Sequence, residues 1–530
     1  MFTHIFGFEV RYWLRRPMVY IFLFVNFILI FGATCSDSIQ IGGAVGNVHK
    51  NAPLIIENWF GVLGLIMGLI MTAAFMQGAA LRDFDNNTYQ IVFASPISRA
   101  SYYFGRFLGG ATVSVIPFFG IALGVLLGSV VAPMMGWTEA ERFGPTYFSV
   151  YFNSFTVLVI PLVLIAGGII FTIAALTRST MAAFIAALTL LMAYAVSGVF
   201  LRDLDNENVL VFTDIFGLRA LGLTTKYWTI EQKNTLSVGF FYGKMFINRL
   251  FWLAIAAVIV GVGYFRFSFT EKTSGKKQKD KQVSAPETGT SAFAPTQALP
   301  AFATQTGIMA RLSQCWTVAK IEYFAIAKDT TFIVLLFIGV LNMVLSLLFT
   351  KGAYGLTQYP VTYNVLETIT GSMQIFLLAQ ITFASGQVVW RERDAKFDQI
   401  YDALPYPTWV SYVGKFSALL AIVCTVQSFK MICGIAKQAT ECYYNFEIGQ
   451  YLIALFMQDA FLYVCMIALS MLIHTLLNDK YIAFFAFIFF MVVFNFIWTP
   501  LDVSSKMLQL FEYPTDDYSD IAGYGPSQLA

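Results

Sequence analysis

VVWRERDAKFDQIYDALPYPTWVSYVGK, residues 388–415, lies between two long apolar runs and carries six charged residues within Arg391–Asp398. A similar stretch, LRDFDNNTYQIVFASPISRASYYFGRF, occupies residues 81–107. The two stretches align without a gap at a constant offset of 309 residues. This register pairs Arg82 with Arg391, Asp83 with Glu392, Asp85 with Asp394, Gln90 with Gln399, Pro96 with Pro405, Gly105 with Gly414 and Arg106 with Lys415. We therefore expect the chain to contain an internal duplication.

The composition predicts an all-α protein that crosses a membrane many times. Of the 530 residues, 58% are hydrophobic and 12% are charged, whereas soluble domains are roughly 45–50% apolar and about 25% charged. An apolar run of about 18 residues is long enough to span a bilayer as a helix. Eleven spans are expected, near residues 17–35, 59–80, 106–131, 154–176, 180–200, 248–266, 332–349, 371–390, 414–435, 451–473 and 481–500.

Prolines and glycines within these runs have an expected structural role. Pro117 and Pro161 fall inside the third and fourth runs, where neighbouring helices can satisfy the backbone groups that a proline leaves free. Glycines recur at helical spacing in two runs, which predicts close helix packing rather than a ligand site. They are Gly61, Gly64 and Gly68, and Gly120, Gly124 and Gly128.

The spans divide into two transmembrane halves of about six helices each, residues 1–269 and 307–530. Residues 270–306 are rich in Lys, Ser, Thr, Pro and Ala, and we interpret them as a disordered cytoplasmic linker. The duplicated stretch follows the second span of each half, and an even number of spans separates the copies, so the halves share one orientation as parallel repeats. The tail YSDIAGYG (518–525) resembles FTDIFGLR (212–219), which precedes the sixth span of the first half. We therefore expect the second half to be truncated and the chain to be part of a longer product.

Lys and Arg predict that the N-terminus is cytoplasmic. With that orientation, the inner segments contain Arg15, Arg16, the lysines of residues 272–281, and both copies of the duplicated stretch. Positive charge is enriched in short cytoplasmic loops of membrane proteins. Both copies should then lie on the cytoplasmic side of the membrane.

Two interpretations of the duplicated loops are open. One is a polar connector between two helices. The other is a docking element for a soluble protein, because each loop opens with paired charges, continues through an amphipathic stretch and turns at a proline. The residue before proline is disfavoured in the helical region, so a short helix should end near Ala94 and near Ala403. The candidate docking residues are Arg82, Asp83, Asp85, Pro96, Arg99, Arg391, Glu392, Asp394 and Pro405.

This pattern resembles the membrane permeases of type 2 ABC exporters. In that family the loop between spans two and three forms a coupling helix that contacts the ATPase, and the segment before the first span forms an interfacial elbow helix. Residues 2–16 and 309–328 occupy the elbow position in the two halves. The segments IQIGGAVGNVHKNAP (39–53) and YNFEIGQYL (444–452) are further similar to a bacterial double-length subgroup, which is often fused to a zinc peptidase domain like aminopeptidase N.

The chain itself carries no motif of ATP hydrolysis or zinc proteolysis. A P-loop needs G-x-x-x-x-G-K-[ST], whereas Gly239–Met245 has the wrong spacing, and no H-E-x-x-H segment occurs. We expect no cofactor in this chain. The resemblance implies that ATP acts through separate ATPase subunits, expected in two copies. Membrane lipid, and a C-terminal peptidase domain in a longer product, are the other expected partners; a nucleic acid is not.

Lys430 and Asp459 fall well inside the predicted spans of the second half. A charge at the centre of a bilayer costs about 2.5–3.5 kcal/mol on insertion scales. The two residues could form an ion pair inside the bundle or contact a substrate. Alternatively, Lys430 could extend to the outer surface, since it lies 15 residues beyond Lys415, about 22 Å along a helix.

Two functions are therefore open. The first is the permease subunit of an ATP-driven exporter, and the second is a membrane platform that anchors a peptidase or another complex without transporting anything. The duplicated loops favour the exporter, since an anchor needs neither eleven spans nor two docking elements. The sequence does not select a substrate.

Overall fold

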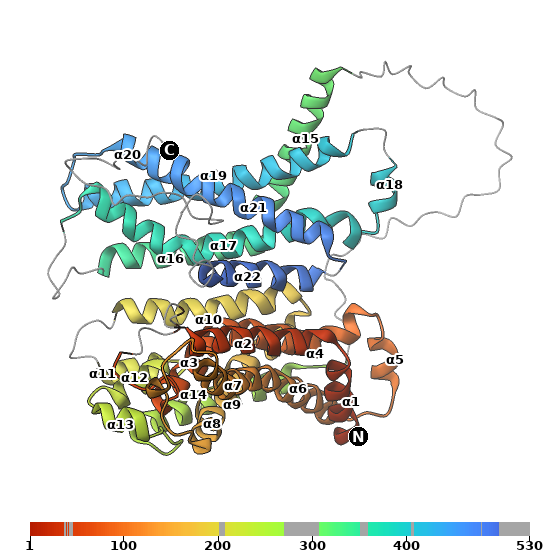
Figure 1. Cartoon of the computed structure of the whole chain (residues 1–530). Helices are drawn as coiled ribbons and strands as arrows, with labels where there is room; N and C mark the ends of the chain where they lie inside the picture. Colours follow the sequence, from red (N-terminus) through yellow and green to blue (C-terminus); the bar gives the residue numbers. More distant parts are fainter. Residues whose placement is uncertain are drawn as a thin grey trace.

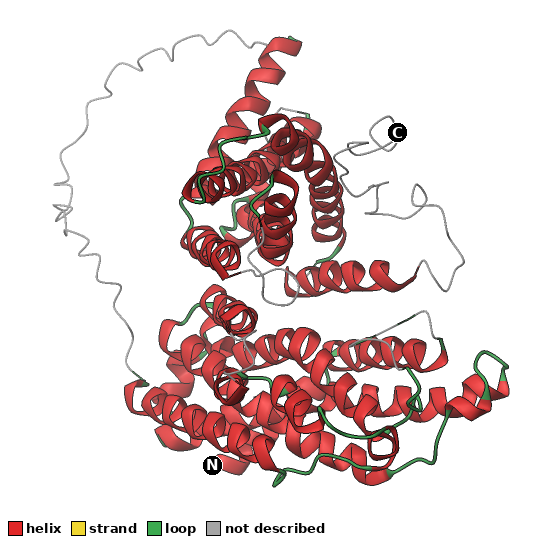
Figure 2. Cartoon of the chain, turned by 90° about the vertical axis from the view of Figure 1, so that its left-hand side faces the viewer, coloured by secondary structure: helices red, strands yellow, loops and turns green. Residues whose placement is uncertain are grey.

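The computed structural model describes residues 1–36, 39, 41, 46–200, 207–269, 307–349, 359–403, 407–478 and 480–497. The described part is helical and contains no strand (Figure 2). The predicted linker 270–306 and the tail beyond residue 497, on which the expected truncation rests, lie outside the described residues. The all-α prediction is confirmed.

The helices of the first half follow the predicted spans and elbow. They are α1 (Phe2–Leu14), α2 (Pro17–Cys35), α3 (Pro53–Leu63), α4 (Leu69–Asp85), α5 (Tyr89–Ala94), α6 (Arg99–Val115), α7 (Phe119–Met134), α8 (Phe148–Ser154), α9 (Ile160–Thr177), α10 (Thr180–Phe200), α11 (Glu207–Thr213), α12 (Leu218–Thr225), α13 (Ile230–Thr235) and α14 (Gly243–Arg266). Short 3-10 or π segments join some of them: η1 (Gly64–Gly68), η2 (Ile116–Phe118), η3 (Ala140–Arg142) and η4 (Phe155–Val159).

The helices of the second half are fewer. They are α15 (Ile308–Ala327), α16 (Thr330–Phe349), α17 (Thr362–Asp394), α18 (Asp398–Asp402), α19 (Thr408–Thr440), α20 (Ile448–Leu452), the π segment η7 (Ile453–Gln458), α21 (Asp459–Leu476) and α22 (Lys480–Ile497). Within the described residues, ten helices are long and apolar enough to cross a membrane, and they coincide with the first ten predicted spans. The eleventh predicted span coincides with α22, whose apolar stretch Ile482–Met491 is shorter.

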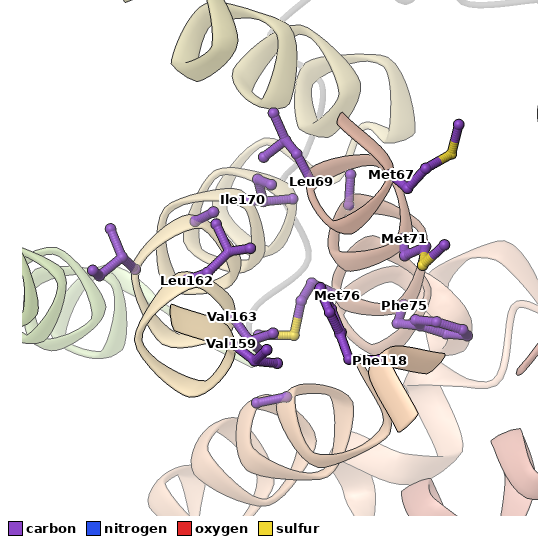
Figure 3. Packing of buried hydrophobic residues seen from close by; sticks show 14 of the residues in the cluster. Met67, Leu69, Met71, Phe75, Met76, Phe118, Val159, Leu162, Val163 and Ile170 are labelled. Carbon is purple, nitrogen blue, oxygen red and sulfur yellow. The ribbon is translucent and has the colours of Figure 1, made fainter. Parts of the chain in front are cut away.

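The long helices run roughly side by side and form two groups (Figures 1 and 2). One core of buried apolar residues extends from Trp13 to Phe267, and the other combines Met192 with residues 326–491. Helix α10 packs against α16 between the groups. It also contacts α17, where the ring centroids of Phe184 (α10) and Phe383 (α17) are 5.7 Å apart. In the first core, Met76 of α4 lies beside Val159 and Val163 (Figure 3).

The glycines of α7 allow it to approach α2 closely. A Cβ atom added at Gly120 would lie 2.1 Å from the carbonyl oxygen of Leu23, and one at Gly124 would lie 2.9 Å from that of Phe27. Real side chains do not approach backbone this closely, so only glycine permits the contact. The predicted packing role of these glycines is confirmed.

The two intramembrane prolines lie at local changes of helix type. Pro117 is within the 3-10 turn η2, and the Nδ2 atom of Asn26 donates to its carbonyl oxygen at 3.1 Å. Pro161 is the second residue of α9, which begins directly after the π segment η4. Proline removes one backbone donor, and local 3-10 or π geometry together with a neighbouring side chain accommodates the loss.

Candidate functional site

Two short helices, α5 and α18, lie on the same side of the molecule, at the ends of the long helices (Figure 1). Helix α5 ends at Ala94, and α18 ends at Asp402 with Ala403 as its C-cap. Ser95 already has extended backbone, as the residue before Pro96 should. The prediction of a short helix ending near Ala94 and near Ala403 is confirmed.

Each of these two helices exposes one large apolar side chain next to an exposed glutamine, Gln90 or Gln399. Ile91 of α5 is 76% exposed and Ile400 of α18 is 60% exposed. Phe397, which precedes α18, is also exposed. Helix α5 is held to its bundle by Phe93, whose ring contacts Phe84 and Tyr102 at centroid distances of 5.7 and 5.6 Å.

The charges before α5 are buried, contrary to the expectation that they face a partner. Arg82 and Asp83 belong to the last turn of α4 and form part of a cluster around Glu9 of α1. The Glu9 carboxylate, which is fully buried, accepts from Arg82 at 2.5 Å and from Arg106 at 2.6 Å. Arg106 also donates to Asp83 at 2.5 Å.

Two aromatic side chains complete this buried cluster, which we call the Glu9 cluster (Glu9, Arg82, Asp83, Arg106). The indole Nε1 of Trp13 donates to Glu9 at 2.8 Å, and the Tyr102 hydroxyl donates to Asp83 at 2.7 Å. A buried charge must be paired and hydrogen-bonded to avoid a large desolvation cost. The cluster therefore fastens α1 to α4 and α6, and its charges do not form a contact surface.

A looser version of this arrangement occurs in the second half. Arg391 of α17 pairs with Glu322 of α15, and Lys415 of α19 pairs with Glu392 of α17 at 2.8 Å. Here the Arg391 side chain is 34% exposed. Burial raises the pKa of Glu322, although Arg391 and Lys415 oppose that shift. The charged residues again join the helix before the first span to the two helices that flank the short one.

The remaining predicted docking residues have different environments. Asp85 and Pro96 are exposed, so they remain available to a partner. Arg99 instead donates to the carbonyl oxygen of Phe267 at 3.3 Å. Asp394 pairs with Lys480 at 2.7 Å. Pro405 lies outside the described residues.

The sequence did not identify Glu9 and Glu322 as site residues. Each is the sole acidic residue of its helix, α1 or α15, among basic and apolar neighbours. An isolated acidic residue in an otherwise basic amphipathic helix was the available signal. Its partners lie 73 and 97 residues away for Glu9, so the pairing itself depends on tertiary structure.

Lys430 and Asp459 meet inside the second half. The Lys430 Nζ atom is fully buried and lies 2.9 Å from the Asp459 carboxylate, to which Thr370 also donates at 3.3 Å. Lys430 therefore does not extend to the outer surface. Asp459 begins α21 directly after η7, and Gln427 donates to the carbonyl oxygen of Leu455 within that π segment. Such π segments are frequent at functional sites.

No family model, no curated protein and no solved structure matches the chain. Among the described residues, no group of three or more His, Cys, Asp or Glu side chains is arranged to hold a metal ion. What the chain does must therefore be inferred from the exposed helices, the charge clusters and the intramembrane pair.

Proposed function

We propose that the chain is the transmembrane permease subunit of an ATP-driven exporter, in which separate ATPase subunits dock on α5 and α18. One observation carries the proposal: two short helices, each with one exposed isoleucine, project on one side of a bundle of membrane-length helices. An exposed isoleucine flanked by polar residues on a short, anchored helix suits insertion into a groove of a soluble partner.

The proposal includes an internal duplication of two parallel halves. Its support is the gapless alignment of residues 81–107 with 390–416, together with the equivalent positions of α1 and α15, α4 and α17, and α6 and α19 around the charged residues. Parallel repeats would place two equivalent docking helices on the cytoplasmic side of a bacterial inner membrane, with the N-terminus on that side.

The charge clusters suggest how motion at α5 and α18 would reach the membrane spans. Three residues separate α4 from α5 and four separate α5 from α6, and the Glu9 cluster joins the end of α4 and the first half of α6 to α1. A displacement of α5 would therefore move these segments together. Two copies of an ATPase that close on ATP would draw α5 and α18 toward each other and shift the bundle between two arrangements.

The alternative is a membrane platform that anchors a peptidase or another complex. The Lys430–Asp459 pair favours the exporter, because an ion pair inside a membrane bundle is costly and is typical of substrate or ion pathways. The first half has no equivalent of this pair, because the register of 309 residues aligns Lys430 with Ile121.

Co-purification from native membranes tests the proposal. The full chain, carrying an affinity tag, should recover a nucleotide-binding ATPase, and I91D with I400D should abolish that recovery. The matched control is F241D, an equally exposed apolar position (83%) outside α5 and α18, which should retain the ATPase. Recovery of a peptidase without any ATPase would contradict the proposal and support the platform.

A further inference from the structure

An open cavity of about 380 Å³ lies beside α18, bounded by the end of α17, the start of α19 and the end of α21. Its volume is within the range of roughly 300–1,000 Å³ that ligand pockets occupy. Two acidic and two basic side chains line it: Glu392, Arg393, Asp398 and Lys415. The Glu392–Lys415 pair neutralises one charge of each sign.

The corresponding space in the first half is filled by the chain itself. Residues that follow α14 return to α5 and α6, where the rings of Phe269 and Phe93 stack at 4.5 Å. The ring of Phe267 stacks on Tyr102 at 5.8 Å, and its backbone carbonyl accepts from Arg99. Aromatic packing therefore closes the space between α5 and α6.

The second half replaces this aromatic lining with polar groups. In the register of 309 residues, Arg393 replaces Phe84, Asp398 replaces Tyr89 and Ser411 replaces Tyr102. All three replacements line the cavity. An apolar plug would desolvate Arg393 and Asp398 without pairing them, which is unfavourable; Ser411 is already hydrogen-bonded to Tyr401. The cavity is therefore suited to a polar ligand.

The two charges outside the Glu392–Lys415 pair define the ligand. Neither the Arg393 guanidinium nor the Asp398 carboxylate forms an ion pair with another residue in the described part of the chain. Arg393 lies over the ring of Trp390 at 4.9 Å, which leaves its donors available. A guanidinium binds phosphate or carboxylate oxygens, and a carboxylate binds an ammonium group. The Tyr401 ring is already covered by the Lys415 ammonium at 5.5 Å, so the ligand's ammonium is assigned to Asp398 alone.

We propose that this cavity binds a small zwitterion carrying an ammonium group and a phosphate, the chemistry of a phosphoethanolamine headgroup. Arg393 holds the phosphate and Asp398 holds the ammonium group. Phosphate is favoured over carboxylate because the cavity lies where α17 and α19 leave their apolar stretches, which is the level of lipid headgroups. Both bilayer lipids and free glycerophosphodiesters carry this headgroup.

Ligand binding would fix α18 against the bundle. Asp398 and Tyr401 belong to α18, whereas Arg393 and Lys415 belong to α17 and α19, so a ligand held by both sets joins the short helix to two long ones. Binding at this cavity does not depend on the proposed ATPase partner, and the two can be tested separately.

The experiment measures affinity and hydrogen exchange with the full chain in two arms. In detergent, soluble glycerophosphoethanolamine is titrated; in nanodiscs, phosphatidylethanolamine is compared with phosphatidylcholine alone. The ligand should slow amide exchange at residues 398–403. R393Q and D398N should each weaken binding about tenfold, since each removes one charge-assisted contact. The controls K396Q and D85N alter exposed charges outside the cavity and should bind normally.

Each outcome decides the proposal. Slowed exchange in both arms supports the site with either source, and slowed exchange only with phosphatidylethanolamine nanodiscs assigns the ligand to the bilayer. Glycerol 3-phosphate binding as tightly as glycerophosphoethanolamine would overturn the zwitterion. Equal weakening by the control variants, or no response in either arm, would overturn the site.

Discussion

Removing the charge of Glu9 should release α1 from the bundle. Glu9 is fully buried and accepts from Arg82, Arg106 and Trp13. In E9Q, two buried guanidinium groups would share Asp83 as their remaining carboxylate in this cluster. Removing one partner of a buried ion pair costs about 3–5 kcal/mol, because the other partner stays buried and unpaired.

This cost predicts a local acceleration of hydrogen exchange in α1. A loss of about 3–5 kcal/mol raises the opening equilibrium of a local unit by roughly 10²–10⁴-fold. Hydrogen exchange of the full chain should therefore show residues 2–14 exchanging faster by this order in E9Q. Exchange in α16 and α17 of the second half should stay unchanged, because those helices do not contact the Glu9 cluster.

The matched control is E322Q in the second half. The partner Arg391 is 34% exposed, so water screens that pair and its net value is about 0–1 kcal/mol. Burial also raises the pKa of Glu322, so a neutral side chain is tolerated there. The reasoning would be refuted if E322Q accelerated hydrogen exchange of α15 as much as E9Q accelerates that of α1. Normal exchange of α1 in E9Q would refute it as well.

Three further predictions concern other parts of the molecule. Because the pKa of Glu322 is raised in the folded protein, stability should decrease as pH rises from the unfolded pKa through the folded one. The protection factors of the α15 amides, corrected for the intrinsic exchange rate at each pH, should therefore be higher at pH 5 than at pH 8. E322Q should remove this difference, and equal protection factors at both pH values in the unmodified chain would contradict the prediction. G120A places a Cβ 2.1 Å from the Leu23 carbonyl oxygen and should lower stability by about 1–3 kcal/mol, whereas G261A, with open space around it, should not; thermal unfolding in detergent compares them. K430M or D459L alone should each cost about 3–5 kcal/mol, and the double variant should cost less than either; additive losses in a double-mutant cycle would show that the pair is not coupled.

Much of the fold follows from local sequence. Apolar runs of about 18 residues predicted the membrane-length helices, because a bilayer fixes the length of a span. Pro96 predicted the end of α5, since proline restricts the residue before it. The spacing of Gly120 and Gly124 predicted the close contact with α2. Each of these signals operates within one helix or one turn.

The site was only partly predictable, because burial of a charge is a tertiary property. Arg82 and Asp83 were expected on a docking surface, but Glu9 and Arg106 bury them. The position of Lys430 along its helix was compatible with either an outer or an inner placement, and packing against α21 decides for the ion pair with Asp459. The exposed residues Ile91 and Ile400 replace the charged pairs as the proposed contact points.

The account depends most on the placement of α5 and α18 on one face of the membrane. Single cysteines I91C and I400C, in a variant in which all six native cysteines are replaced by serine, can be labelled with a membrane-impermeant maleimide. Both should react only after the inner membrane is permeabilised, whereas Y227C, on the opposite side, should react in intact spheroplasts. If the cysteines at positions 91 and 400 were labelled from opposite faces of the membrane, both the duplication and the shared docking side would be contradicted.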